Sequence, residues 1–331
     1  MPSPAPRAAI AAGLILALAG CGGGTARAPG QRARARAVGT GPGAGTALSL
    51  RPLFLGTLPA AVQDAAAAAL PDGRVLLLGG LTAADTSTGA VTVISDGRAT
   101  AAGALPTPQH DAQAATIGSY AYVFGGGELT SYDHILRYDP AAQTAVQVGT
   151  LPSAASDVAV ASVGDVAYVV GGYDGVRWLD TILAWRPGSA PRVVGHLPFG
   201  LRYAAVAAVG TRLIIAGGTR TAGLSDRILS FDTRTGSLTP IGSLPSPLTH
   251  ASAVALDGQV VIVGGRRALN GDQTAAVLAV DPSTGRARTL TQLPHPLSDA
   301  AVVMDGGRIL VAGGDGGSGA VSTVWALTPT A

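Results

Sequence analysis

The chain has 331 residues, of which 47% are hydrophobic and 13% charged, and it contains one cysteine. The hydrophobic fraction is sufficient for a buried core, and a single cysteine excludes a disulfide within the chain. The formal net charge is +2, but five of the 22 arginines precede residue 46 and all 20 acidic residues follow it. The region after residue 46 therefore holds 17 arginines against 20 acids, a formal charge of −3. A nucleic-acid-binding domain needs a basic face, so we expect no nucleic-acid partner.

The first twenty residues have the features of a secretory signal. Arg7 precedes an apolar run over residues 8–19, which is shorter than the roughly 20 residues that span a bilayer and fits a signal peptide. The segment LAGC at residues 18–21 resembles a bacterial lipobox, in which the chain is cut before the cysteine and the cysteine is acylated. An ordinary signal peptide with an incidental cysteine is the alternative. We therefore predict a signal peptide over 1–20 and an extracytoplasmic protein held at the cell membrane by lipid on Cys21.

Residues 21–46 are rich in glycine, alanine and arginine and show no apolar period. This composition predicts a flexible tether. The arginines of RARAR, residues 32–36, could contact anionic lipid headgroups, or the segment could be a solvated linker. Both readings stay open from the sequence.

An apolar run that ends in a glycine pair occurs six times along the rest of the chain. We expect the strand to end at these glycines and backbones to approach closely there. The second glycines of the six copies lie 46, 46, 46, 47 and 49 residues apart. One repeat, residues 151–197, contains four short extended segments separated by turn residues, predicted at 157–163, 166–170, 181–185 and 192–195. Four antiparallel strands in each repeat predict a β-propeller blade, and six repeats predict six blades.

The first strand of each repeat is built of small residues, as in AAAAAL at 65–70 and VAVAS at 158–162. Small side chains fit the innermost strand, where the blades converge on the axis. The sixth repeat lacks a fourth strand, and the segment 48–55 can supply it beside residues 322–327. Such pairing would close the ring and remove an unpaired strand edge. The sequence thus predicts an all-β, six-bladed propeller over residues 47–331, closed by its N-terminal strand.

Two of the repeats, GGYDGVRWLDTILAWRP (171–187) and GGTRTAGLSDRILSFDTRTG (217–236), resemble Kelch repeats. Repeats of that family have a double glycine followed about a dozen residues later by an aromatic residue, here Tyr138, Trp185 or Phe231. The other three copies depart from the pattern with Ile94, Val280 and Leu327. The resemblance implies a propeller of the galactose oxidase/Kelch superfamily, whose channel mouth commonly binds a peptide or a sugar.

Each blade is expected to be entered through a loop that begins with Leu-Pro. Alignment of the repeats on Leu-Pro shows that polar residues open the innermost strand of every blade, at the mouth of the central channel. They are Gln63-Asp64, His110-Asp111, Ser156-Asp157, Arg202-Tyr203, Thr249-His250 and Ser298-Asp299. The repeated aspartates are also explained by bonding to their own turns, whereas Arg202, Tyr203 and His250 break the repeat and are stronger candidates for function.

The loops that follow the glycine pairs are expected on the same face, and they add arginines and aromatic residues. An arginine fork suits a carboxylate, and a tryptophan offers a flat face to a sugar ring or a cation. The predicted ligand-binding residues are Arg202, Tyr203, His250, Trp178, Arg177, Tyr173, Arg220, Arg266, Asp111 and His110. Arg267 lies in the same set of loops, and we interpret His134, His196 and His295 as incidental.

Enzymes of the Kelch superfamily provide the alternative function. Galactose oxidase needs copper and a cysteine–tyrosine crosslink, and this chain has no cysteine besides Cys21. Sialic-acid mutarotase is thought to use a glutamate and an arginine at the mouth, and the sole glutamate, Glu128, follows a glycine pair on that face. We therefore expect a propeller that binds a protein partner or a glycan, without cofactor or metal and with no catalytic residue assigned. The alternative is a mutarotase or isomerase of carbohydrate acids.

Overall fold

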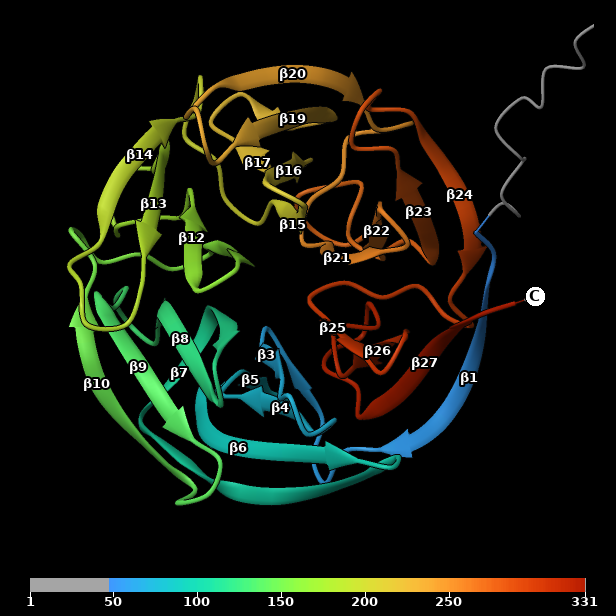
Figure 1. The fold of residues 1–331 in the computed structure, drawn as a ribbon. Coiled ribbons are helices and arrows are strands. Elements are labelled where there is room, and N and C mark those ends of the chain that lie inside the picture. The colour runs from blue at the N-terminus through green and yellow to red at the C-terminus, as the bar shows by residue number, and fades with distance from the viewer. Residues whose placement is uncertain (1–47, 331) are drawn as a thin grey trace, which may run out of the picture. The chain divides into compact units, whose positions relative to one another are not determined.

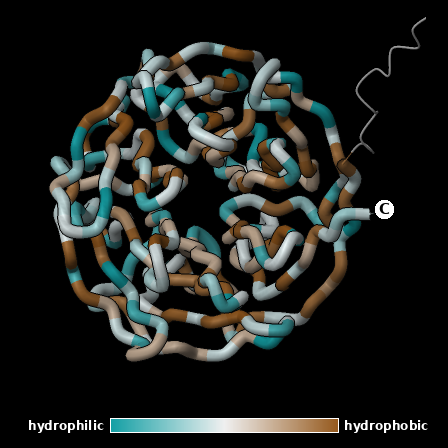
Figure 2. Tube along the Cα trace, in the orientation of Figure 1, coloured by the Kyte–Doolittle hydropathy of each residue, from teal (hydrophilic) through white to brown (hydrophobic). Residues whose placement is uncertain are grey.

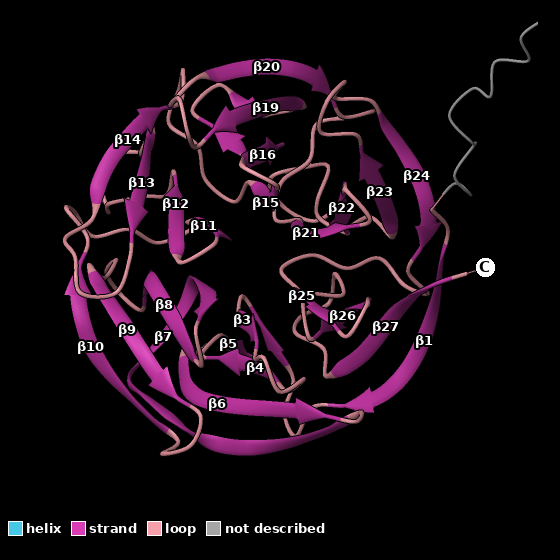
Figure 3. Cartoon of the chain, in the orientation of Figure 1, coloured by secondary structure: helices cyan, strands magenta, loops and turns pink. Residues whose placement is uncertain are grey.

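The computed structural model describes residues 48–330, which form a ring of six blades around an axis (Figure 1). Four blades are separate four-stranded sheets, and blades 1 and 2 share one long strand and so form a single seven-stranded sheet. Strands and loops make up this part of the chain, without a helix (Figure 3), so none of these residues forms a helix that could cross a membrane. The predicted signal peptide, Cys21 and the tether lie outside the described residues.

The blades follow one another in chain order, and each runs from an innermost to an outermost strand. Blade 1 contains β3 (Ala66–Ala69), β4 (Val75–Leu78), β6 (Thr88–Ser95) and the first part of β7 (Arg98–Ile117). Blade 2 contains the rest of β7, β8 (Tyr120–Gly127), β9 (His134–Asp139) and β10 (Thr144–Thr150). Blade 3 contains β11 (Ala159–Val163), β12 (Val166–Val170), β13 (Thr181–Trp185) and β14 (Arg192–His196).

Blade 4 contains β15 (Ala205–Val209), β16 (Arg212–Ala216), β19 (Arg227–Asp232) and β20 (Leu238–Ser243). Blade 5 contains β21 (Ser252–Leu256), β22 (Gln259–Val263), β23 (Ala276–Val280) and β24 (Ala287–Gln292). Blade 6 contains β25 (Ala301–Asp305), β26 (Arg308–Ala312), β27 (Thr323–Pro329) and β1 (Leu50–Thr57). Two short ribbons pair β2 (Val62–Gln63) with β5 (Leu81–Thr82), and β17 (Thr219–Arg220) with β18 (Gly223–Leu224).

The N-terminal strand closes the ring as predicted. Strand β1 pairs antiparallel with β27 from Leu50 opposite Pro329 to Thr57 opposite Thr323, and the two lie side by side in Figure 1. The guanidinium of Arg288 in blade 5 also donates to the carbonyl oxygen of Leu48 at 3.1 Å. The last blade is therefore complete, and the ring is fastened by strands from the two ends of the described chain.

Strand β7 differs from the prediction of a loop at each Leu-Pro segment. It runs unbroken through residues 105–108, LPTP, from the outer edge of blade 1 to the axis of blade 2. The physical reason is that proline fixes φ near the extended region and disfavours helical geometry in the residue before it. A segment with two prolines in four residues can therefore continue as extended chain.

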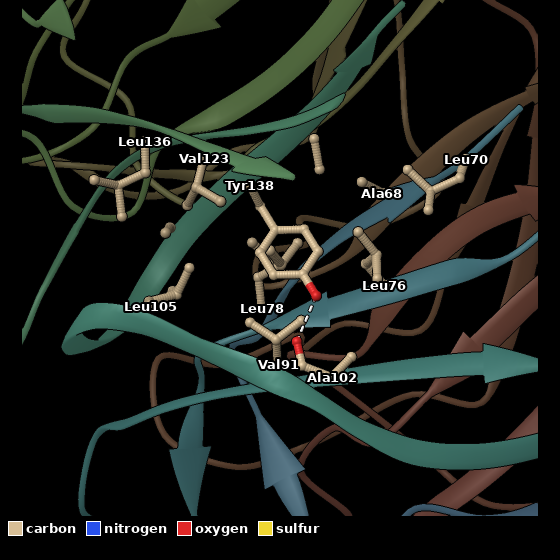
Figure 4. Packing of buried hydrophobic residues seen from close by; sticks show 13 residues of the cluster. Ala68, Leu70, Leu76, Leu78, Val91, Ala102, Leu105, Val123, Leu136 and Tyr138 are labelled. Atoms are coloured by element: carbon tan, nitrogen blue, oxygen red, sulfur yellow. Dashed lines mark hydrogen bonds between the residues drawn. The ribbon is translucent and has the colours of Figure 1, made fainter. Parts of the chain in front are cut away.

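The core lies between neighbouring blades. Apolar residues recur along the strands of every blade (Figure 2), and the aromatic residues Tyr138, Trp185 and Phe231 of the third strands are fully buried. Figure 4 shows the cluster around Tyr138, which contains side chains from blades 1 and 2, and the Tyr138 hydroxyl donates to the carbonyl oxygen of Ala102 in blade 1. Each blade thus buries its apolar face against the next one.

The glycine pairs join each blade to its successor. Gly171 has φ +64°, and a Cβ there would lie 2.2 Å from the carbonyl oxygen of Leu201 in the loop that leads into blade 4. The same oxygen accepts a hydrogen bond of 2.8 Å from the Gly172 N–H. Only glycine allows both the left-handed backbone and this close approach. The first glycine of each other pair is placed in the same way, since a Cβ there would lie 2.0 to 2.6 Å from a backbone oxygen of the next blade. These glycines are Gly79, Gly125, Gly217, Gly264 and Gly313.

Candidate functional site

Six residues form a hydrogen-bonded ring around one end of the channel, and we call them the mouth ring: Asp64, Asp111, Asp157, Tyr203, His250 and Asp299. The backbone N–H of each donates to the carbonyl oxygen of the residue one blade before it, at 2.9 to 3.3 Å, and the sixth bond closes the circle from Asp64 to Asp299. All six have positive φ, between 51° and 59°. Aspartate and histidine are among the residues that tolerate this conformation, while a bulky tyrosine adopts it rarely. The repeated aspartates thus have a structural reason, and Tyr203 is the exception.

Arg202 sits in a cage of aromatic rings beside the mouth ring. Its guanidinium forms an ion pair with Asp157, and its Cζ lies 4.7 Å from the ring centroid of Tyr173, 5.5 Å from that of Trp178 and 5.1 Å from that of Tyr203. These distances are within the range of cation–π attraction. The positive charge of Arg202 is therefore already balanced by the protein.

Arg266 is engaged in a similar way on the other side of the ring. It forms an ion pair with Asp299, donates from Nε to the Ser298 hydroxyl at 3.0 Å, and lies 3.8 Å from Asp315. The Asp315 carboxylate also accepts a hydrogen bond of 2.9 Å from Gln273. Both arginines at the mouth ring are thus paired with carboxylates of the same chain.

Asp64 and Asp111 have no arginine or lysine within 4 Å among the described residues. Burial raises the pKa of Asp64 well above its ordinary value, and the negative charges of Asp299 and Asp111 add to this. Burial and the charge of Asp157 likewise raise the pKa of Asp111, which accepts a hydrogen bond of 3.2 Å from the Tyr203 hydroxyl. These two carboxyls are the group in the ring that most readily takes up a proton.

The two imidazoles near the ring are neutral at neutral pH. Burial lowers the pKa of His250 to about 4, and its ring stacks on Tyr203 with centroids 3.7 Å apart. Burial also lowers the pKa of His110, whose Nδ1 lies 2.8 Å from the Ser87 hydroxyl and whose Nε2 lies 3.6 Å from Asp111. Neither histidine therefore offsets the acidic charge of the ring.

A cavity of about 480 Å³ opens beside the ring between the loops that follow the glycine pairs of blades 2 and 3. We call it the blade 2–3 groove. The Ser131 hydroxyl joins the two loops, because it donates to the Tyr173 carbonyl oxygen at 3.0 Å and its oxygen lies 3.2 Å from the Ser156 hydroxyl, which can donate to it. The groove is lined by His110, Asp111, residues 127–131, Ser156, Asp157, residues 173–176 and Arg202. Two aliphatic residues of its lining face solvent, Leu129 with 96% of its surface exposed and Val176 with 84%.

The structure brings most of the predicted ligand-binding residues to this region. Those in the mouth ring, in the Arg202 cage or in contact with them are Arg202, Tyr203, His250, Trp178, Tyr173, Arg266, Asp111 and His110. Glu128 lines the groove together with Arg202.

Three arginines of the loops after the glycine pairs make their contacts outside the mouth ring. Arg177 and Arg220 were predicted ligand-binding residues, and Arg267 was named beside them. Arg177 pairs with Asp174 of its own loop at 3.2 Å, and Arg267 pairs with Asp272 of its own loop at 2.9 Å. Arg220 lies over the Phe199 ring, 5.2 Å from its centroid. Sequence reasoning missed Asp315, although it directly follows the glycine pair 313–314 and alignment on those glycines would have identified it.

Within residues 48–330, no group of three or more histidine, cysteine, aspartate or glutamate side chains is placed to hold a metal ion. The groups that the structure gathers at the mouth include the ion pairs, the two carboxyls without an arginine partner and the exposed aliphatic residues of the groove.

Comparison with known proteins identifies the family. The model of the KLHDC2/KLHL20/DRC7 Kelch-repeats domain matches residues 65–265, more than half of the chain. The chain belongs to this Kelch-repeat family. Among solved structures, the Kelch domain is similar to YjhT, with a TM-score of 0.70 and 17% identity, over 83% of this chain and 98% of that chain. At this identity the likeness shows the fold alone. Comparison with curated proteins gives no match.

Proposed function

We propose that this Kelch propeller is an extracytoplasmic protein that binds a protein partner at its channel mouth and is anchored to the membrane by lipid on Cys21. The LAGC segment supports the anchor, and membership of the Kelch family supports a binding propeller. Incorporation of a fatty-acid analogue that is lost in Cys21→Ser checks the anchor, and incorporation that persists in that variant contradicts it.

The exposed aliphatic residues of the blade 2–3 groove carry the proposal of a protein partner. Removing a valine or leucine side chain from water is favourable by about 1.5–3 kcal/mol before the costs of association are subtracted, and exposed apolar patches rimmed by polar residues mark interaction sites. Leu129 and Val176 are almost fully exposed at this groove. A glycan would instead need open aromatic faces, and the Arg202 guanidinium lies against the rings of Tyr173 and Trp178.

A pull-down with the full chain tests this proposal. The double variant Leu129→Ser/Val176→Ser should lose the captured partner, with affinity reduced at least about fivefold, because truncation of a residue that anchors an interface costs more than about 1 kcal/mol. Leu269→Ser is the matched control, since Leu269 is 54% exposed in a loop of blade 5 and does not line the groove. A partner that the double variant retains, or glycan-array binding without protein capture, contradicts the proposal.

One observation favours a second candidate, a mutarotase or isomerase of carbohydrate acids. Glu128 and Arg202 line the same groove, which places a carboxylate and a guanidinium on one binding cavity. Anomer exchange of a sugar acid, followed by NMR, should then be faster with the wild-type chain than in buffer and return to the buffer rate with Glu128→Gln. A wild-type rate equal to that of buffer excludes this candidate.

A further inference from the structure

We propose that the partner segment in the blade 2–3 groove is basic and apolar, with a lysine or arginine next to an aliphatic or aromatic residue. This inference rests on the proposed function and specifies the chemistry of the protein partner.

The first argument is the charge of the groove. Four carboxylates line it, those of Asp111, Glu128, Asp157 and Asp174, against the single guanidinium of Arg202. Arg202 pairs with Asp157, and Arg177 pairs with Asp174. Asp111 and the exposed Glu128 have no arginine within 4 Å in the described part of the chain, and the nearby His110 is neutral. The groove therefore lacks a cation of its own for these two groups. Burial raises the pKa of Asp111, so the exposed Glu128 is the unpaired negative charge that a partner would meet.

The second argument is that, within residues 48–330, the two arginines in contact with the mouth ring are not free for an acidic partner. The sequence suggested that arginines of the mouth could bind a carboxylate, but Arg202 and Arg266 are bound to Asp157 and Asp299. An acidic segment would have to displace these internal pairs and would place like charges beside Glu128. Like-charge contacts at an interface disfavour the wrong partner.

The third argument is the pattern of the two loops. Glu128 and Leu129 are adjacent and both exposed, and Val176 presents a second exposed aliphatic side chain to the same groove. An acidic group next to an aliphatic one is complementary to a basic residue next to an apolar residue. Charge and apolar contact thus indicate the same class of peptide.

Selection of a random displayed peptide library on the full chain tests the inference. We expect enrichment of peptides that contain lysine or arginine beside leucine, isoleucine, valine or phenylalanine. The affinity of an enriched synthetic peptide should fall roughly two- to fivefold in Glu128→Gln, the range for an exposed ion pair, and should fall as salt is raised. Asp96→Asn is the matched control, because it removes an exposed charge from the turn between β6 and β7 and asparagine tolerates the positive φ there.

The outcomes separate this inference from the proposed function. Enriched peptides that are acidic or lack basic residues, but still bind more weakly to Leu129→Ser/Val176→Ser, overturn the basic character and leave the binding function intact. An affinity that is the same in Glu128→Gln and wild type has the same meaning. If no peptide is enriched, or if binding is unchanged in the double variant, the proposed function fails as well.

Discussion

Asp64 and Asp111 stand in the mouth ring, and neither has a guanidinium partner within residues 48–330. Burial together with neighbouring carboxylates raises the pKa of both. Each carboxyl has a higher pKa in the folded protein than in the unfolded chain. At pH values between these two pKa values, the folded protein binds more protons than the unfolded chain. The contribution of each carboxyl to stability is therefore complete below the unfolded pKa and is lost as the pH rises through the folded pKa. At neutral pH these two residues destabilise the fold.

We expect Asp111→Asn to have a larger free energy of unfolding than wild type at neutral pH, because the amide cannot ionise and can still accept from Tyr203. The difference in free energy of unfolding between the variant and wild type should shrink on acidification, by at most about 1.4 kcal/mol per pH unit. Urea unfolding at neutral and mildly acidic pH measures it, with the exposed Asp165→Asn as control. An Asp111→Asn variant less stable than wild type at neutral pH, or a gap independent of pH, contradicts this account.

The positions of the mouth-ring residues were predictable from the sequence, whereas the ion pairs between their carboxylates and the neighbouring arginines were not. Alignment of the repeats on Leu-Pro placed the six residues at one end of the channel, since the same offset in each blade gives the same place on the axis. The ion pair of Arg266 with Asp299 joins two blades and depends on side-chain geometry that no repeat offset specifies. The sequence for that reason suggested free arginines where the structure has paired ones.

At the scale of the element, the glycine pair acts as a joint between blades. The sequence predicted that backbones approach closely at these glycines, and the contact of Gly171 with the Leu201 carbonyl confirms it. Strand boundaries were less accurate: residues 157–163 were predicted as one strand, but β11 begins at Ala159 because Asp157 has the positive φ of the mouth ring. A local backbone reversal of this kind leaves little trace in apolar patterning.

Gly171→Ala should destabilise the protein much more than Gly164→Ala. The two glycines have φ values of +64° and +60°, but a Cβ at 164 meets no atom within 4 Å, whereas one at 171 lies 2.2 Å from a backbone oxygen. The control therefore reports the left-handed strain of alanine, about 1–2 kcal/mol, and Gly171→Ala adds the forced separation of blades 3 and 4. Thermal or urea unfolding compares them, and equal losses of stability would show that the joint is unimportant.

At the scale of the whole molecule, the repeat spacing was enough to predict six blades and a ring closed by the N-terminal strand, because each blade needs its neighbours to bury both faces. The groove was not predictable, since it depends on which loop residues face solvent. Leu129 and Val176 are ordinary residues in the sequence and become distinctive only through their exposure beside acidic groups. The features that all six repeats share therefore specify the fold. The candidate site instead depends on loop residues that differ between repeats.

Hydrogen exchange of the full chain, with and without a saturating bound peptide from the display selection, tests the central claim most directly. We predict slower amide exchange in residues 127–131 and 173–178, which border the blade 2–3 groove, and no change in the outer strands β10 and β14. Protection confined to those outer strands or to the turn at 164–165, with both loops unchanged, would contradict the assignment of the groove as the binding site.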